Sequence, residues 1–214
     1  VIRPLGGSKV KFPEIWPGAP PAVEGDTPVS GPERLSYLGE AADALAAVTY
    51  DLGDRGISWL AWLLRQPFFR CKLIVVVYPA CTTRQEHLEA LAELSSQHEG
   101  RLAVRIFPVN TKAGLLTVMT FVRPEQPSVM LIGGAGNLGM DPEAAGLANM
   151  LYEPRPLELD RWCEWFDDLW RRSASLCPET IRIPRLVPAQ GSPKAQELWE
   201  DYVGTCFANV LQRS

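Results

Sequence analysis

The sequence predicts an α/β protein in which a largely covered sheet is layered against helices. Cys71–Tyr78 (CKLIVVVY) is an uninterrupted apolar, β-branched run apart from one lysine, which is typical of a strand buried on both faces. On either side of this run, segments with a strand pattern alternate with segments that have a helical pattern. Such alternation favours a layered sheet whose faces are covered by helices.

Length and composition limit the classes of protein that this chain fits. Its 214 residues are enough for one well-buried core and rather few for two. A formal net charge of −4 excludes a strongly basic nucleic-acid binder and leaves a local basic pocket open. The longest apolar runs are too short to cross a bilayer, so we expect no membrane partner. Because the sequence begins with Val1 rather than Met, a longer parent protein also stays open.

Cysteine usage indicates the cellular compartment. The five cysteines are widely spaced and include no CxxC pair, so the sequence predicts neither a metal site nor a disulfide framework. We therefore expect a reducing, cytoplasmic location, with most of the cysteines acting as small core residues.

The first half of the chain divides into an arm and the beginning of the domain. Residues 1–32 contain seven prolines and cannot sustain a helix or a central strand, so they are expected to form an arm or linker. Residues 33–214 then form the α/β domain with its C-terminal helices. A helix is expected from Glu33 to about Leu45, a strand over Ala46–Leu52 and a short apolar helix over Ile57–Leu64.

After Cys71–Tyr78 the alternation continues. Thr82–His98 is predicted to be a helix, because leucines 88, 91 and 94 fall on one helical face. Leu102–Phe107 alternates as a strand, and Gly114–Val122 and Ser128–Ile132 are two further expected strands.

Two amphipathic helices are predicted to close the chain, and their apolar stripes are expected to pack mainly in the core. The first stripe consists of Leu159, Trp162, Trp165, Phe166, Leu169 and Trp170. The second consists of Leu198, Trp199, Tyr202, Val203, Cys206, Phe207, Val210 and Leu211, and it could instead cover a partner or a second copy.

The glycine-rich segment that follows the last long strand has two interpretations. Gly134–Gly139 (GAGNLG) matches the GxGxxG pattern of a dinucleotide-binding loop, whose backbone amides face phosphates. Pro142, however, interrupts the helix that should follow the third glycine, and no second strand with an acidic end is evident. A nucleotide-cofactor-binding enzyme therefore remains an alternative, and we expect no cofactor.

The other interpretation uses more of the chain, roughly residues 33–177. Asn110-Thr111-Lys112, the turn Gly134-Ala135-Gly136-Asn137 and the later Asn149 resemble, in this order, the motifs of the phospholipase D superfamily. The resemblance implies a phospholipase D-like single lobe in which Lys112 is the motif lysine. Glu153 falls two residues beyond the family's usual acidic position, which Leu151 occupies.

The chain departs from that family at the residue that carries the chemistry. The family uses a histidine as its nucleophile, whereas Asn110 stands at this position, so the motif is degenerate. An amide neither attacks phosphorus nor exchanges a proton near neutral pH. The only two histidines, His87 and His98, fall outside the motif and are expected at the surface or at helix caps.

The resemblance therefore implies a non-catalytic domain, a pseudoenzyme that serves as an interaction, dimerisation or phosphate- or nucleic-acid-sensing module. Its anion- or phosphate-binding candidates are Asn110, Lys112, Gly134, Asn137, Asn149 and Glu153. Because lobes of this family work in pairs, the resemblance implies a homodimer or a second lobe in a longer chain. It also leaves a nucleic-acid-processing protein open as the setting of the domain. The alternative within the same fold is an active phosphodiesterase or nuclease with an atypical site.

Overall fold

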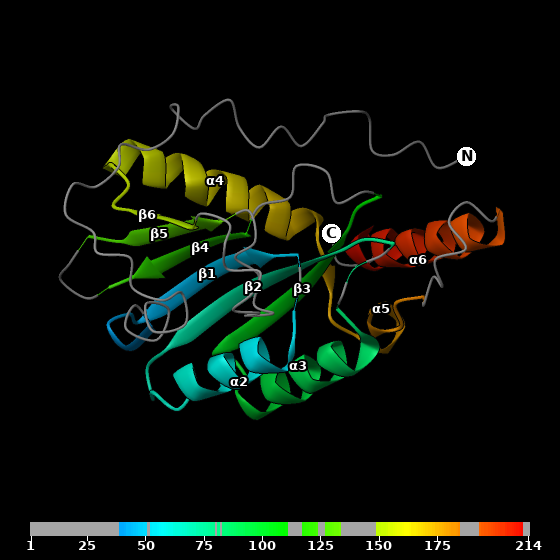
Figure 1. The fold of residues 1–214 in the computed structure, drawn as a ribbon, viewed down its shortest axis with the longest axis horizontal. Helices are drawn as coiled ribbons and strands as arrows, with labels where there is room; N and C mark the ends of the chain where they lie inside the picture. Colours follow the sequence, from blue (N-terminus) through cyan, green and yellow to red (C-terminus); the bar gives the residue numbers. More distant parts are fainter. Residues whose placement is uncertain are drawn as a thin grey trace.

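A computed structural model describes residues 39–50, 52–79, 81, 83–110, 117–123, 127–133, 149–184 and 193–211. Within these ranges one seven-stranded sheet, with the order β6-β5-β4-β1-β2-β3-β7, has helices on both faces (Figure 1). The layered α/β architecture expected from the sequence is therefore confirmed. The predicted arm, residues 1–32, lies outside the described residues.

The centre of the sheet is parallel. β1 (Ala44–Thr49), β2 (Arg70–Val77) and β3 (Leu102–Pro108) run in the same direction, with Val48 opposite Ile74 and Val75 opposite Ile106. Two helices connect them, α2 (Asp54–Leu63) and α3 (Gln85–Gln97). β2 lies between two neighbours and under helices on both faces, which is why its sequence is an almost unbroken apolar run.

The flanks of the sheet are antiparallel. β4 (Thr117–Val122) pairs with β1, β5 (Val129–Gly133) pairs with β4, and β6 (Asn149–Tyr152) pairs with β5. On the other side, the two-residue β7 (Ala174–Ser175) pairs with β3. This topology brings the ends of β1, β2, β3 and β5 and the beginnings of β4 and β6 to the same edge. We call it the carboxyl edge, and the opposite one the amino edge.

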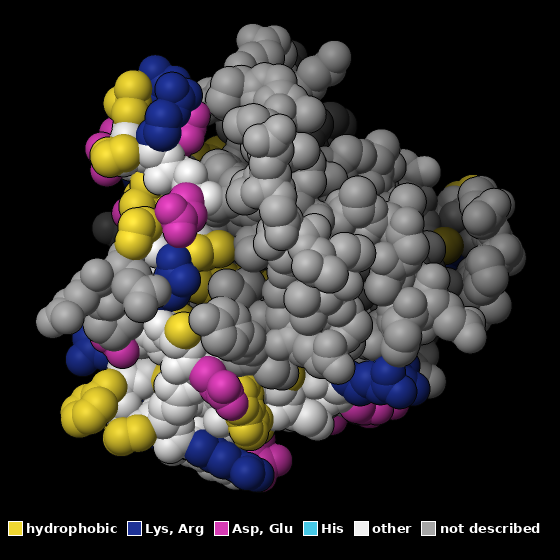
Figure 2. Space-filling model, turned by 60° about the vertical axis from the view of Figure 1, so that its left-hand side comes forward, with side chains coloured by type: hydrophobic (Ala, Val, Ile, Leu, Met, Phe, Trp, Pro, Cys, Tyr) yellow, Lys and Arg dark blue, Asp and Glu magenta, His cyan; other side chains and the backbone are white. Residues whose placement is uncertain are grey.

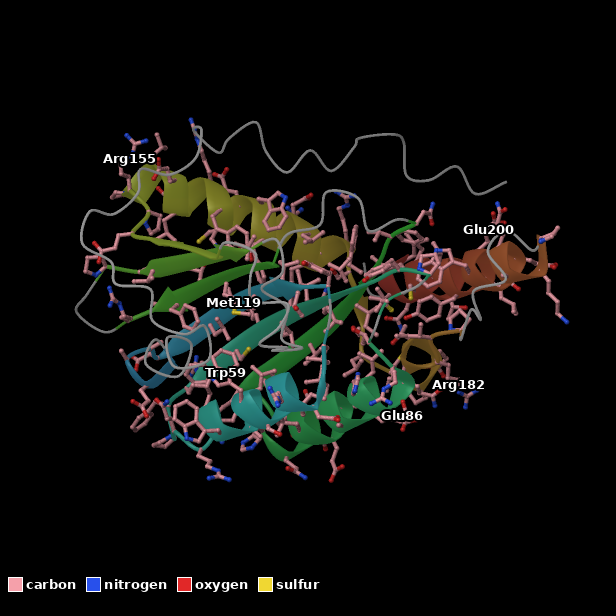
Figure 3. The ribbon with its side chains drawn as sticks, in the orientation of Figure 1. Trp59, Glu86, Met119, Arg155, Arg182 and Glu200 are labelled. Carbon is pink, nitrogen blue, oxygen red and sulfur yellow. The ribbon has the colours of Figure 1, made fainter. Side chains whose placement is uncertain are left out.

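Successive side chains of each strand enter two separate cores. One core lies under α2 and α3 and includes Trp59 and Met119, both labelled in Figure 3, together with residues of α6 (Pro193–Leu211). The other lies under α4 (Pro156–Arg172), where Trp162, Phe166 and Leu169 pack against alternate residues of β1, β2 and β3. The predicted stripe of α4 is thus confirmed. In α6, Trp199, Tyr202 and Cys206 are buried in the core of the same chain.

Several elements differ from the expectation. β1 begins at Ala44, inside the segment that was expected to be helical as far as Leu45, and in the described residues only 39–40 are helical there. β6, β7 and the one-turn α5 (Pro178–Ile181) were not predicted. They contain four, two and four residues, which is too short for a periodic pattern to be recognised.

Two further observations concern membrane-spanning helices and metal sites. None of the described helices is both long and apolar enough to cross a bilayer. In the same part of the chain, no group of three histidine, cysteine or acidic side chains is arranged to hold a metal ion. Cys71 and Cys206 are buried as expected for core residues, whereas Cys163 is exposed.

Candidate functional site at the carboxyl edge

The carboxyl edge brings together parts of the sequence that carry the predicted site. Asn110 follows the end of β3, Thr117 begins β4, and Gly133, the last residue of β5, pairs with Asn149, the first residue of β6. The described residues that flank segments 111–116 and 134–148 therefore all lie at this edge. Lys112, Gly134 and Asn137 belong to these segments and lie outside the described residues.

Asn110 is exposed and has a defined partner. The indole Nε1–H of Trp199, in α6, donates a hydrogen bond of 3.1 Å to Oδ1 of Asn110. Because an indole N–H only donates, the atom that it contacts is the amide oxygen, and Nδ2 is the other end of the group. The backbone leading to Asn110 continues the sheet, since the N–H of Val109 donates to the carbonyl of Val77. The amide is thus held at the end of β3 with its orientation fixed by α6.

Asn110 and Asn149 lie at the same edge of the sheet but on strands that are far apart. β3 and β6 are five strand positions apart in the strand order. At the usual spacing between neighbouring strands, this corresponds to about 24 Å along the sheet. A ligand that touches both residues would have to be long.

Glu153 lies at the other end of the sheet. It follows the last residue of β6 and therefore lies at the amino edge, about 13 Å from Asn149 along the strand. Its Oε1 is 3.4 Å from Nη2 of Arg123, which also donates to the carbonyl of Pro127. The structure thus gives Glu153 an ion pair on the far side of the sheet and does not bring it together with Asn110.

His87 lies at the carboxyl edge, at the start of α3, which Glu86 marks in Figure 3. It was expected at the surface or in a cap, and it is a buried cap. Its Nδ1 lies 3.1 Å from the backbone N of Arg84, and its Nε2 lies 3.2 Å from Nη2 of the same arginine and 3.5 Å from Asp54 Oδ1. Both Arg84 groups only donate, so the unprotonated nitrogen of the neutral ring, whichever it is, accepts from Arg84. The one lone pair of this imidazole is therefore engaged by Arg84 in either tautomer.

The pKa of His87 is lowered. Burial of the imidazole is the main cause, the Arg84 guanidinium adds to it, and Asp54 and Glu86 act in the opposite direction. A neutral imidazole is too weak an acid to give up its N–H proton near neutral pH, and one whose lone pair is already engaged has no free nitrogen to receive a proton. His87 is therefore not arranged as a general acid or base.

His98 is remote from this edge. It ends α3 at the amino edge, where Nη2 of Arg101 donates to its Nδ1 over 2.6 Å. Neither histidine thus supplies the group that Asn110 lacks.

The buried thiols of the described residues are not activated nucleophiles either. Burial raises the pKa of Cys71 and of Cys206 to about 12, so both remain thiols near neutral pH. Cys81, which follows β2 at the carboxyl edge, is partly buried, with its Sγ 3.6 Å from the carbonyl of Thr83.

Trp199 is the residue of this site that sequence reasoning missed. It is 3 % exposed, and its ring packs against Tyr202, with the centroids 5.4 Å apart. Its helical spacing predicted burial correctly. Its contact with Asn110, however, joins positions 89 residues apart, and no local pattern indicates such a pairing.

Comparisons with known proteins give likenesses of structure only. No protein-family model and no curated protein matches the sequence. Nuc, a phospholipase D family member from Salmonella typhimurium, has 14 % identity and a TM-score of 0.47, over 66 % of this chain and 86 % of that one. TrmBL2, an archaeal chromatin protein, has 12 % identity and a TM-score of 0.43, over 68 % of this chain and 50 % of that one. In fold, the chain is similar to Nuc.

Proposed function

We propose that this chain is a non-catalytic, phospholipase D-like domain that binds a phosphate group at its carboxyl edge. The observation that carries the proposal is the state of Asn110, which occupies the position of the nucleophile in the resemblance. Its oxygen is engaged by Trp199, so the exposed amide offers a donor rather than a nucleophile. A donor of this kind suits binding of an anion and does not suit attack on phosphorus.

Further groups support an anion site at this edge. Lys112 lies two residues beyond Asn110 and brings a positive charge, and the glycine turn that contains Gly134 and Asn137 directly follows β5. A glycine-rich turn can offer several backbone N–H groups to one anion. Asn149, the first residue of β6, is a further candidate at the same edge by its position in the sheet.

We propose further that the domain works as one half of a pair. Its sequence contains a single set of these motifs and no internal repeat. A second copy, or a second lobe in a longer chain, would supply the other half. A persistent pair would bury about 1,000 Å² or more in total, and light scattering at micromolar concentration measures the mass directly. A monomer at that concentration would argue against a homodimer.

Hydrolysis tests the non-catalytic role. A bis-aryl phosphodiester and single-stranded DNA should be cleaved no faster by the protein than in the blank. Turnover that Lys112→Ala abolishes would contradict the proposal and would identify an active phosphodiesterase with an atypical site.

Binding tests the phosphate site itself. Inorganic phosphate or pyrophosphate should raise the melting temperature of the protein, because a ligand that binds only the native state stabilises it. Lys112→Ala should remove this increase, and Lys194→Ala, a matched change at an exposed lysine of α6, should retain it. Equal increases in the two variants would place the anion elsewhere.

A further inference from the structure

On the face of the sheet that α4 covers, the amino-terminal halves of β2 and β3 remain open. Arg70, Lys72 and Ala103 are exposed, although Cys71 and Leu102, which point to the opposite face, are buried. Side chains of a strand alternate between the faces, so these exposed residues all lie on the α4 side. The side of the molecule where β1–β3 begin comes forward in Figure 2, where positive and negative side chains are interspersed on the coloured surface.

Small side chains surround the two cations on this open face. Ala44 and Ala46 of β1 are the register partners of Arg70 and Lys72, and Ala103 of β3 is the partner of Lys72 on the other side. A methyl group extends little above the sheet. The positive side chains of Arg70 and Lys72 therefore have only small side chains at these register positions.

β3 adds a third cation, Arg105, and the end of α4 adds an aromatic ring, Trp170. Nζ of Lys72 lies 5.7 Å from the centroid of the Trp170 ring, and Cζ of Arg105 lies 4.8 Å from it. Arg105 also donates to the backbone carbonyls of Trp170 and Ser173 at the end of the helix. These contacts hold Lys72 and Arg105 beside one another. We call Arg70, Lys72 and Arg105 the basic strip.

An exposed aromatic residue precedes the strip. The side chain of Phe68, two residues before Arg70, is 82 % exposed. Its loop is nevertheless held in place, because Nη1 of Arg101 donates to the carbonyls of Leu64, Gln66 and Pro67 over 3.0, 2.9 and 3.4 Å. Gln66 in turn donates to the carbonyl of Gly39 over 3.2 Å. A fixed backbone therefore presents this phenyl ring to solvent.

We propose that the basic strip and Phe68 bind single-stranded nucleic acid. Proteins that bind single strands combine positive side chains along the backbone with aromatic rings on which bases stack. Arg70 and Lys72 supply the charges, and Phe68 supplies a platform. A paired duplex hides the faces of its bases, so a single strand fits the ring better. This surface is separate from the carboxyl edge and does not depend on the phosphate site proposed there.

The experiment measures the anisotropy of a fluorescein-labelled oligothymidylate with the full chain at several salt concentrations. The wild-type protein should bind, with an affinity that falls as salt rises. Arg70→Ala and Lys72→Ala should each weaken binding and make the log–log salt slope less steep by about 0.7. Phe68→Ala should weaken binding by at least about fivefold and leave the slope unchanged, because it removes stacking and not charge.

Matched controls use exposed positions elsewhere. Lys194→Ala removes one lysine from α6, and Leu157→Ala truncates an apolar side chain of α4 that is 62 % exposed. Both should bind like the wild type, and thermal melts establish that every variant is folded. Absence of binding by the wild type, or equal losses in the controls, would overturn the proposal.

Two further outcomes distinguish nucleic-acid binding at the basic strip from binding of an acidic protein and from nucleic-acid binding at the carboxyl edge. Displacement of the oligonucleotide by polyglutamate at equal charge concentration would identify an acidic protein partner and overturn the nucleic-acid assignment. Loss of binding in Lys112→Ala with retention in Lys72→Ala would move the nucleic acid to the carboxyl edge, which would support the proposed function and overturn this one. The opposite result would support the basic strip, whatever the phosphate assay shows.

Discussion

Trp199 and Asn110 are joined by a hydrogen bond of 3.1 Å that connects the last helix to the end of the central parallel strands. It is the one described contact in which a predicted site residue meets the side chain of a distant core residue. The bond therefore couples the stability of α6 to the geometry of the carboxyl edge.

A double-mutant cycle measures this coupling. Trp199→Phe and Asn110→Ala each remove the bond, and urea unfolding of both single variants and of the double variant gives the interaction term. We expect about 1 kcal/mol, the usual net contribution of one hydrogen bond. A term indistinguishable from zero would mean that the indole holds α6 by packing alone.

His87 should make the protein less stable in mild acid. Because the folded-state pKa is lowered, the unfolded state binds more protons once the pH falls below the ordinary histidine value of about 6.5. The free energy of unfolding should therefore be complete above that value and decline as the pH falls towards the folded-state pKa.

Two histidine variants distinguish the helix-capping role of His87 from the effect of its protonation. His87→Gln keeps an acceptor for the Arg84 N–H and should lose this part of the pH dependence. His98→Gln leaves His87 in place and should keep it. Chemical denaturation between pH 7 and pH 5 distinguishes the two, and identical profiles for them would refute the assignment to His87.

Thr120 offers an opportunity for stabilisation. Its hydroxyl is buried in β4 and has no hydrogen-bond partner among the described residues. Thr120→Val removes an unsatisfied polar group with little change in shape, and should raise the free energy of unfolding by about 1 kcal/mol.

The same substitution at Thr180 should have the opposite effect. That hydroxyl is also fully buried, but it donates to the carbonyl of Ser175 over 2.7 Å and accepts from the N–H of Cys177 over 3.0 Å. Thr180→Val should cost about 1–3 kcal/mol. Calorimetric melts of the pair provide the test, and a shift of the same sign in both would contradict it.

Gly100 permits the turn between α3 and β3. Its φ of 74° is in the left-handed region, and a Cβ added there would meet no atom within 4 Å. Gly100→Ala should therefore destabilise the protein by about 1 kcal/mol through its backbone alone, whereas Gly100→Asn should cost less. Equal losses in denaturant titrations would indicate a steric cause instead.

The sequence predicted those elements whose patterns are long. The apolar run of β2 and the leucines of α3 repeat over enough residues to identify strand and helix directly. β6 and β7 are recognisable only by their partners, because a strand of two to four residues has too few positions to show alternation.

The candidate site was predictable only in part, since the strand topology decides which of its residues lie at the same edge of the sheet. That Asn110 and Asn149 share an edge follows from the directions of β3 and β6, which depend on β6 being recognised as a strand. Without β6, nothing in the sequence indicates that Glu153 is carried to the opposite end of the sheet.

The core beneath α2 and α3 is completed by residues that are synthesised late. β3 ends at residue 108, and α6, which buries Trp199, Tyr202 and Cys206 in that core, begins at residue 193. At about 5–20 residues per second, a ribosome needs roughly 4–17 s to translate the interval of about 85 residues. During that time α2 and α3 can cover this face, but the part of it that α6 covers is open to solvent. The nascent chain should therefore be a substrate for chaperones until α6 emerges.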